Sequence, residues 1–374
     1  MSTDKFTLEE YILSIKFSIA ILFFCFTIGC HENGDGPPPG KDCDPASVIS
    51  CESSADRWQL LGLDGESVVA IETDPCDPRI LYVGTQFDFS AGRPAKLFNS
   101  TDCGKTWDTL FVSNNTGGVR TIWVNPKERN ILFSLPYSIL KSIDGGKHWQ
   151  ESANGIYLDF DTRVQCLAVD PKDINVMYAG TGGFFGGYLY KSTNSGLNWT
   201  RVLPDSLGDG VSSIAIDPEN SKNLYVGTAG SGIIIKSTDA GLSWNYSGMG
   251  ETGSIIHDIF IDADHNSNIY AGVNIFGLYK SEDFGVSWTK WNQGLPSSFS
   301  IVKIKKNYLK NTMYVIGTYG DNGWIYEFSN VQNQWIKIGI DSLRQSYYYS
   351  DLKLSSDNKT LYFGGKGIYT KAAQ

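Results

Sequence analysis

One pattern of eight residues, Ser-x-Asp-x-Gly-x-x-Trp, recurs along this chain of 374 residues and constrains its fold more than any other feature. The five copies run from Ser100 to Trp107, Ser142 to Trp149, Ser192 to Trp199, Ser237 to Trp244 and Ser281 to Trp288. Their tryptophans are spaced 42, 50, 45 and 44 residues apart. A repeat of this length is typical of propellers and solenoids, in which each repeat forms one unit of supersecondary structure.

A second repeat alternates with the first and indicates the strands within each unit. It has the form Val-x-x-Ile-x-x-Asp-Pro, a short polar stretch, and then Tyr-x-Gly-Thr. Seven segments follow this form more or less closely, and they begin at Val68, Val119, Val164, Val211, Ile256, Ile301 and Tyr349. Short runs rich in Val, Ile and Tyr, broken by Gly and Asp-Pro, indicate strands. Four strands in each repeat predict the blade of a β-propeller.

The two ends of the repeated region predict how the ring closes. The last repeat ends at Gly367–Lys371 without a Trp strand, and the first is preceded by an isolated strand that contains Trp58. Pairing these two fragments would remove two free sheet edges. We therefore expect an all-β fold, a single seven-bladed β-propeller of four-stranded antiparallel blades, closed by an N-terminal strand that completes the last blade.

The eight-residue motif is the Asp-box, and the chain resembles the Asp-box (BNR-repeat) propellers, which include sialidases, xyloglucanase-type glycoside hydrolases, sortilin-type receptors and photosystem II assembly factors. The motif lies at the turn between the third and fourth strands, where its carboxylate can accept backbone N–H groups and its Gly can take a positive φ. The resemblance implies structural roles for Asp102, Trp107, Asp144, Trp149, Asn194, Trp199, Asp239, Trp244, Asp283 and Trp288. A sixth segment, Ser329 to Trp335, lacks the Gly and is one residue shorter.

The N-terminal region differs from the repeats in composition. An apolar run from Phe17 to Ile28 ends at Cys30 in a sequence that resembles a bacterial lipobox, and a Gly/Pro-rich tether follows. We expect a lipoprotein-type signal peptide over residues 1–29, a lipidated Cys30 and flexible tether over 30–56, and the propeller over 57–374. These assignments predict export and a lipid anchor in a bacterial membrane, at the outer membrane or the cell surface. An ordinary cleaved signal peptide is the alternative.

Charge and cysteine content exclude some partners. The net charge is −9 and no basic stripe is present, so a nucleic-acid ligand is not expected. The cysteines and histidines lack metal-ligand spacing, and we expect no metal and no cofactor. Export permits disulfides. We expect Cys76 to pair with Cys103, Cys43 to pair with Cys51, Cys166 to be a buried free thiol, and the chain to be a monomer.

The loops between the second and third strands, and between one blade and the next, share the face opposite the Asp-boxes. We call this the loop face, and its loops are rich in aromatic residues, which stack on sugar rings or contact extended peptides. The candidate ligand-binding residues are Phe87, Arg93, Arg120, Tyr157, Arg163, Phe184, Phe185, Phe276, Tyr319, Trp324 and Tyr348. Charged residues at the channel mouth, among them Asp258 and Asp351, are interpreted as solvated pore lining.

Three classes of function compete. The main interpretation is a non-catalytic, lipid-anchored module that binds a glycan or a protein on the loop face. The alternative is a glycoside hydrolase of the Asp-box propeller type, which needs two carboxylates facing one cleft. Its candidate catalytic residues are Asp88, Asp161 and Asp321. Sialidase activity is disfavoured because the Arg-Ile-Pro signature of sialidases is absent, and Arg79 of the Asp-Pro-Arg segment lies on the opposite face.

Overall fold

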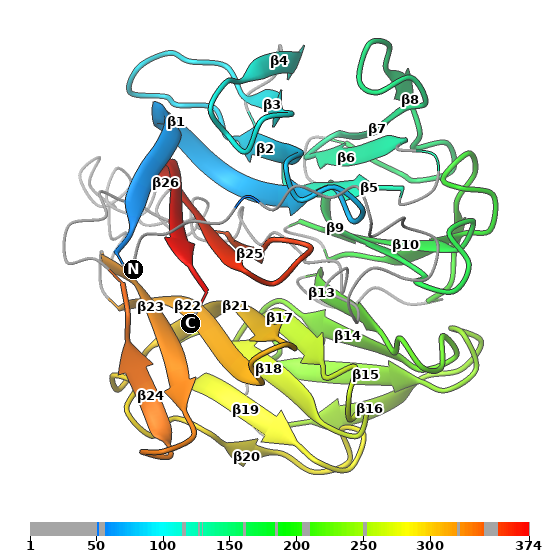
Figure 1. Cartoon of the computed structure of the whole chain (residues 1–374). Helices are drawn as coiled ribbons and strands as arrows, with labels where there is room; N and C mark the ends of the chain where they lie inside the picture. The colour runs from blue at the N-terminus through cyan, green and yellow to red at the C-terminus, as the bar shows by residue number, and fades with distance from the viewer. Residues whose placement is uncertain are drawn as a thin grey trace, which may run out of the picture.

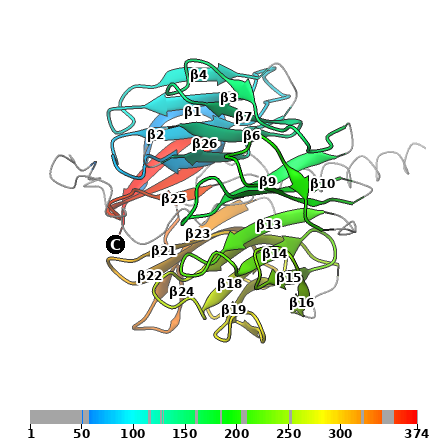
Figure 2. The same cartoon turned by 90° about the vertical axis from the view of Figure 1, so that its right-hand side faces the viewer.

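The computed structural model describes residues 51, 57–113, 117–125, 128, 130–159, 162–183, 186–203, 210–249, 253–319, 322–339 and 351–373. Every regular element within these residues is a β-strand, which confirms the expected all-β class. The strands form antiparallel sheets arranged around a ring (Figure 1). Viewed from the side, the sheets follow one another around that ring, and neighbouring sheets are stacked against each other (Figure 2).

Five of the sheets in the described region contain four strands each, in simple meander order. The first comprises β5 (Thr121–Val124), β6 (Ile131–Leu135), β7 (Ser138–Ser142) and β8 (Gln150–Glu151). The second comprises β9 (Arg163–Val169), β10 (Met177–Gly182), β11 (Leu189–Ser192) and β12 (Thr200–Arg201). The third comprises β13 (Val211–Ile216), β14 (Leu224–Thr228), β15 (Ile233–Ser237) and β16 (Asn245–Gly248). The fourth comprises β17 (Ile256–Ile261), β18 (Ile269–Val273), β19 (Gly277–Ser281) and β20 (Thr289–Lys290). The fifth comprises β21 (Ser300–Asn307), β22 (Thr312–Tyr319), β23 (Asn322–Ser329) and β24 (Gln334–Lys337).

The remaining sheet joins the two ends of the described chain. Its strand order is β25 (Leu352–Leu354), β26 (Thr360–Ala372), β1 (Gln59–Thr73), β2 (Leu81–Thr85), β3 (Lys96–Ser100) and β4 (Asp108–Val112). The beginning of β1 pairs with the end of β26, and the end of β1 pairs with β2. The range of β26 covers a hairpin, because the main-chain N of Ala373 donates to the carbonyl of Lys359 at 2.8 Å. In Figure 1 the red β26 accordingly lies beside the blue β1.

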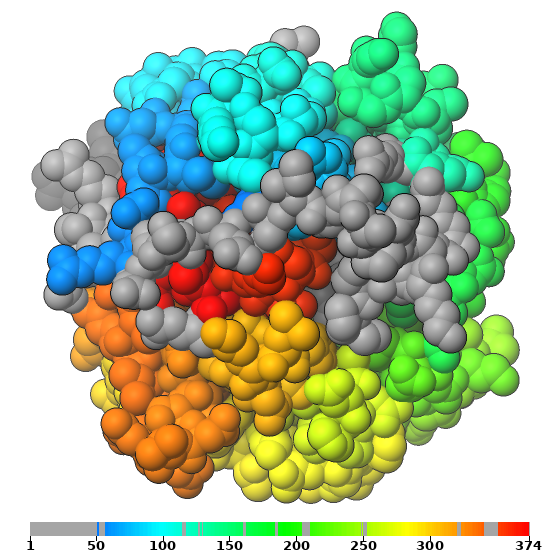
Figure 3. Space-filling view, viewed as in Figure 1, coloured from blue at the N-terminus to red at the C-terminus, as the bar shows by residue number. Residues whose placement is uncertain are grey.

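The core lies between neighbouring sheets, and the Tyr-x-Gly repeat explains how they approach so closely. A Cβ added at Gly227 would lie 2.7 Å from side-chain atoms of Ile256 on the next sheet, and one at Gly272 would lie 2.6 Å from Ile301. Only glycine therefore fits where the second strand of one sheet meets the first strand of the next. The successive repeats form coloured sectors in direct contact in the space-filling view (Figure 3).

The Asp-box turns have the local bonding expected from their sequence. In the copy between β15 and β16, Ser237 Oγ donates to Asp239 Oδ1 and accepts the Gly241 N–H, both at 2.8 Å. Asp239 accepts the N–H and the hydroxyl of Ser243. Gly241 has a φ of 90°, and Ala240 before it also has a positive φ, of 60°. The turn therefore contains two consecutive left-handed residues. The second is glycine, whereas the first is Ala240 here and Ser195 or Phe284 in two other copies.

Several of the tryptophans that follow the turns connect their sheet to the one before it. Trp199 is 3% exposed, and its Nε1–H donates to the carbonyl of Ser152, after β8 of the preceding sheet, at 2.7 Å. Trp335 makes the same kind of bond to the carbonyl of Trp291, after β20, at 3.0 Å. These side chains therefore stabilise the junctions between sheets as well as the sheet to which they belong.

The expected disulfide pairing is wrong. Cys103, in the Asp-box turn of the first repeat, is bonded to Cys51, with a Cα–Cα distance of 5.6 Å. Cys51 reaches this turn because the chain ahead of β1 passes the start of β26, where the Thr360 hydroxyl donates to the Cys51 carbonyl at 2.8 Å. Cys76 is disulfide-bonded, but not to Cys103, and Cys51 does not pair with Cys43. Cys166 is also disulfide-bonded, so the expectation of a free thiol is wrong.

Candidate functional site

Asp88 is the described member of the three candidate catalytic carboxylates, and its bonds are those of a turn-stabilising residue. It lies in the loop after β2, where its Oδ1 accepts the N–H and hydroxyl of Ser90 and the N–H of Ala91. Its Oδ2 lies 3.2 Å from Lys366 Nζ and 3.7 Å from Arg93 Nη2. These donors, with the Ser90 hydroxyl first among them, hold the pKa of Asp88 well below its usual range.

This environment restricts the chemistry open to Asp88. A carboxylate that stays ionised to very low pH can act as a nucleophile or a base, but it carries no proton to donate as a general acid. A two-carboxylate mechanism would therefore need its acid elsewhere. The other two candidates, Asp161 and Asp321, lie outside the described residues.

The arginines assigned to the loop face contact polar and aromatic neighbours. Arg120 Nη1 donates to Gln165 Oε1 on the next repeat at 2.6 Å. The Arg163 guanidinium lies 5.3 Å from the centroid of the Tyr137 ring. Arg93 is the partner of Asp88 described above. These three arginines lie in separate segments, Arg163 at the start of β9, and each contacts a different neighbour.

The aromatic candidates fall into an exposed and a half-buried group. Tyr157 is 64% exposed and Tyr319 is 48% exposed, so both rings are open to a ligand. Phe87 is half-buried and packs edge-on against Phe89 with centroids 4.9 Å apart, and Phe89 itself is 68% exposed. Two half-buried rings are covered by lysines, Phe276 by Lys290 and Trp324 by Lys337. Phe184, Phe185 and Tyr348 lie outside the described residues.

The charged residues at the inner strands are buried structural groups, which corrects their interpretation as solvated pore lining. Asp258 is 2% exposed and accepts the main-chain N–H of Ile304 on the next sheet at 2.8 Å. Asp351 is 4% exposed and accepts the N–H of Ile71 in the same way. Each carboxylate joins two adjacent first strands near the ring centre. The sequence pattern did not reveal this role, because the bonds link residues far apart in the chain.

The Asp-box carboxylates are also occupied within their own turns. Hydrogen bonds lower the pKa of Asp102, Asp239 and Asp283 to about 2, and the largest contribution comes from the hydroxyl side chain four residues later. Asn194 accepts the equivalent main-chain bond, from Asn198, without any charge. In the described part of the chain, His, Cys, Asp and Glu form no group of three that could hold a metal ion.

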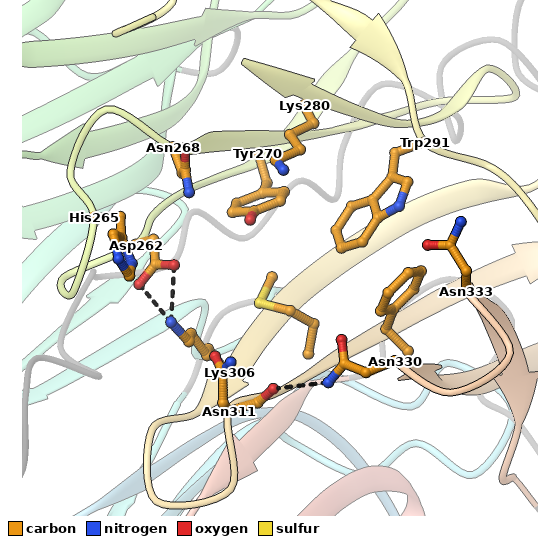
Figure 4. A pocket seen from close by; sticks show the side chains of 12 residues that line it. Asp262, His265, Asn268, Tyr270, Lys280, Trp291, Lys306, Asn311, Asn330 and Asn333 are labelled. Atoms are coloured by element: carbon orange, nitrogen blue, oxygen red, sulfur yellow. Dashed lines mark hydrogen bonds and ion pairs between the residues drawn. The ribbon is translucent and has the colours of Figure 1, made fainter. Parts of the chain in front are cut away.

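A cavity of about 370 Å³ lies at the opposite end of the sheets from the loop face, and sequence analysis did not anticipate it. It opens at the junction of the β17–β20 and β21–β24 sheets, and we call it the junction cavity (Figure 4). One wall is aromatic and consists of Tyr270, Trp291 and Phe328. Polar lining residues are His265, Asn268, Lys280, Asn311, Asn330 and Asn333. The one sequence signal pointing here was the irregular sixth Asp-box segment.

A buried ion pair forms the inner end of the junction cavity. Lys306 Nζ lies 2.8 Å from both carboxylate oxygens of Asp262, and it also contacts Asp264 at 3.1 Å. The Lys306 and Asp262 side chains are only 3% and 5% exposed. Two carboxylates already neutralise Lys306. Of the two lysines that line the cavity, Lys280 is therefore the one better placed to bind a ligand.

The described residues contain no helix that is long and apolar enough to cross a membrane. No protein-family model matches the chain. The chain is 27% identical to a xyloglucanase from Paenibacillus sp over 216 residues, which are 47% of this chain and 20% of that enzyme. It is 25% identical to xyloglucanase Xgh74A of Acetivibrio thermocellus over 150 residues, 34% of this chain and 17% of the relative. The chain thus spans a fifth or less of the length of these relatives.

Solved propellers share the fold. The GH74 enzyme of Niastella koreensis superimposes with a TM-score of 0.61 at 19% identity, over 84% of this chain and 53% of the enzyme. YCF48 from Cyanidioschyzon merolae superimposes with a TM-score of 0.59 at 14% identity, over 84% of this chain and 98% of YCF48. A structure of YCF48 bound to D1 peptide gives a TM-score of 0.60. The chain is therefore a β-propeller, and these likenesses establish only the fold.

Proposed function

We propose that this chain is a glycan-directed propeller that holds a polysaccharide of the xyloglucan class against its loop face. The observation that carries the proposal is the sequence similarity to two xyloglucanases, which covers up to 47% of the chain. The exposed rings of Phe89, Tyr157 and Tyr319 suit such a ligand, because aromatic faces stack on sugar rings.

Hydrolysis is the first form of this proposal, since the similarity to xyloglucanases supports the hydrolase interpretation better than the non-catalytic one. The ionised Asp88 would act as nucleophile or base, and a protonated Asp161 or Asp321 would donate to the leaving oxygen. The distance between the two carboxyl groups would then decide whether the anomeric configuration is retained or inverted.

Binding without turnover is the second form, and one observation favours it. Asp88 is engaged by Ser90, Ala91 and Lys366, so its hydrogen-bonding capacity is used to shape its own loop. A carboxylate used in this way positions neighbouring rings, including Phe87 and Phe89, instead of attacking a substrate. A non-catalytic glycan- or protein-binding module would need nothing more.

The setting of this site is part of the proposal. We interpret the six-stranded sheet as two blades joined by β1, which gives seven blades in all and lets the N-terminal strand close the ring. We also propose that Cys30 is lipidated and that the Gly/Pro-rich tether holds a monomeric propeller near a bacterial outer membrane or cell surface. Labelling with a palmitate analogue, with a Cys30→Ser variant as control, tests the anchor; equal labelling of both proteins would contradict it.

The glycan proposal is tested on the segment from Asp42 to Gln374, which retains Cys51. Binding of xyloglucan oligosaccharides and release of reducing ends are measured on the same samples. Hydrolysis predicts that Asp88→Asn, Asp161→Asn or Asp321→Asn lowers turnover by about 10³-fold or more while binding persists. Lys366→Met is the matched control, because it removes the ion pair and keeps the carboxylate. Binding without turnover selects the second form, and neither binding nor turnover rejects the proposal.

A further inference from the structure

Three junctions between sheets contain the same device, which we call the clamp. A lysine on the third strand of one sheet donates to the main-chain carbonyl of the Asp-box turn on the next sheet. The three bonds are Lys141 to Ser195 at 2.9 Å, Lys191 to Ala240 at 3.0 Å and Lys236 to Phe284 at 2.8 Å. At two of these junctions a tyrosine on the second strand donates to the same carbonyl, Tyr178 to Ala240 and Tyr225 to Phe284, each at 3.1 Å.

The accepting residue has the same backbone conformation in each clamp. Ser195, Ala240 and Phe284 have φ values of 57°, 60° and 59°. Since each is the first of the two left-handed residues of its Asp-box turn, its carbonyl projects from the turn toward the preceding sheet. The clamp is therefore a receptor for one specific group, the exposed main-chain carbonyl of a left-handed turn.

The β17–β20 sheet carries the same two donors. Tyr270 pairs with Lys280 across β18 and β19, as Tyr225 pairs with Lys236 across β14 and β15. Their hydrogen bonds are nevertheless different. Lys280 contacts the exposed side chain of Glu282 at 2.5 Å, and the Tyr270 hydroxyl has no hydrogen-bond partner among the described residues, although Tyr270 is only 5% exposed. We call this pair of donors the open clamp.

The turn that the open clamp faces has lost the Asp-box chemistry. Tyr314 pairs with Glu327, so Glu327 takes the place of Lys236 and Phe328 takes the place of Ser237. In the same register Gln332 takes the place of Gly241. The segment therefore has the full length, and the expectation that it is one residue shorter is wrong; it lacks instead the serine that holds the turn and the glycine that permits its second left-handed residue.

This substitution changes the path of the turn. β23 and β24 remain paired as far as Ser329 and Gln334, whereas β15 and β16 separate after Lys236 and Asn245. The positive φ falls at Asn333, with a value of 50°, and no left-handed pair forms. The carbonyl that would occupy the open clamp is consequently withdrawn, and the junction cavity lies in its place (Figure 4).

We propose that the junction cavity binds a polypeptide turn in trans, with Tyr270 and Lys280 donating to a main-chain carbonyl of the partner. The argument rests on what these donors hold elsewhere in this molecule, since the other clamps all bind such a carbonyl. The cavity volume of about 370 Å³ suits a short segment, being at the lower end of small-ligand pockets. Trp291 and Phe328, with centroids 4.4 Å apart, supply an apolar wall for the partner's side chains.

The present contact of Lys280 does not oppose this assignment. The Glu282 side chain is 72% exposed, and an exposed ion pair contributes little, so a ligand carbonyl can take one of the ammonium hydrogens at small cost. Asn268, Asn330 and Asn333 line the rim and can pair with further main-chain N–H and C=O groups. This site is separate from the loop face on which the glycan proposal rests.

The test uses the full chain and a labelled cyclic peptide with residues 236–245 of this protein, KSTDAGLSWN, whose first and last residues are paired in the native sheet. Fluorescence anisotropy measures its dissociation constant. We expect saturable binding that the double variant Tyr270→Phe, Lys280→Met weakens by about tenfold or more, because it removes two hydrogen bonds, one from a charged donor. The matched control Tyr225→Phe, Lys236→Met should lower the thermal midpoint and leave peptide affinity unchanged.

Each remaining outcome overturns the proposal. Absence of saturable binding, or equal affinity of the parent protein and the Tyr270→Phe, Lys280→Met variant, would show that the open clamp does not hold a peptide. Xyloglucan oligosaccharides that lose affinity in this variant would show that the cavity is a glycan subsite instead. Asp88→Asn should leave peptide binding unchanged, which separates this result from any failure of the glycan proposal.

Discussion

The junction between the β13–β16 and β17–β20 sheets and the next junction along the chain contain the same donors in different states. Tyr225 and Lys236 donate hydrogen bonds to the carbonyl of Phe284, whereas Tyr270 and Lys280 line a cavity. The donor strands share the tyrosine and the lysine at corresponding positions, and the difference comes from the opposing turn. Equivalent side chains thus serve stability at one junction and become available for recognition at the next.

The open junction stays intact because other contacts replace the missing turn. Trp291, Phe328 and Trp335 form a cluster with centroid separations of 4.4, 5.1 and 5.2 Å. The buried pair of Lys306 and Asp262 bridges the same two sheets. The loss of an Asp-box turn therefore produces a local cavity and leaves the two sheets packed against each other.

The largest effect should come from the tryptophans, which both kinds of junction retain. Trp199→Ala and Trp335→Ala should each lower the free energy of unfolding by about 3–5 kcal/mol, because each removes a buried ring and an indole N–H bond to the preceding sheet. Urea unfolding followed by circular dichroism measures both, with Trp→Phe as the milder control. A loss below about 1 kcal/mol at Trp335 alone would mean that the open junction is looser than the structure indicates.

The turn at Cys103 provides a third kind of junction, in which a covalent bond holds the Asp-box. The disulfide from Cys51 closes a loop with a sequence separation of 52. Replacing both cysteines by serine should lower the free energy of unfolding by about 2–4 kcal/mol, mainly because the unfolded chain gains freedom. Thermal unfolding of the oxidised proteins checks this, and an unchanged midpoint would remove the disulfide from the stabilising contacts.

The comparison is sharpest for a single hydroxyl group. Tyr225→Phe removes the hydroxyl that donates to the Phe284 carbonyl, so it should lower the free energy of unfolding by about 1 kcal/mol. Tyr270→Phe removes a hydroxyl without a partner in the described structure and should be neutral to slightly stabilising. Chemical denaturation of the two variants side by side decides the matter. Equal losses would show that the open clamp has a partner after all.

The smallest effect concerns pH. The pKa of Asp239 falls to about 2 in the folded protein, from about 3.9 in an unfolded chain. A depressed carboxyl pKa contributes stability above the unfolded value, and that contribution is lost as the pH falls from about 4 to about 2. Asp239→Asn should therefore flatten the thermal midpoint against pH in this window, since Asn194 keeps the turn without a charge. An identical slope in the parent and the variant would contradict this.

The fold was largely predictable because its signals are local. Alternating Val, Ile and Tyr residues, turn glycines and the Asp-box each act over a few residues, and the five regular turns form the bonds that their sequences imply. The candidate site was less predictable. Exposure of Tyr157 followed from its place on a loop and that of Tyr319 from its place at the end of β22, but the bonding of Asp88 depends on Lys366, far along the chain.

The disulfide and the junction cavity show the same limit in opposite ways. The sequence analysis paired Cys76 with Cys103 because both belong to one repeat. No local pattern indicates that Cys51 lies beside the start of β26, within reach of Cys103. The sixth segment was recognised as irregular, yet its consequence lies on the neighbouring sheet, at Tyr270 and Lys280. In both cases the decisive partner lies outside the repeat in which the local pattern occurs.

The sequence by itself determined the all-β class, the repeat, the strand order within each repeat and the conformation of each regular Asp-box turn, because hydrogen bonds within a turn and the alternation of strands depend on near neighbours. Only the tertiary structure decided which cysteines meet, which inner carboxylates join adjacent sheets, and which clamp remains open. Those outcomes depend on how one repeat is placed against the next, and a single buried contact between them involves residues that no local pattern relates.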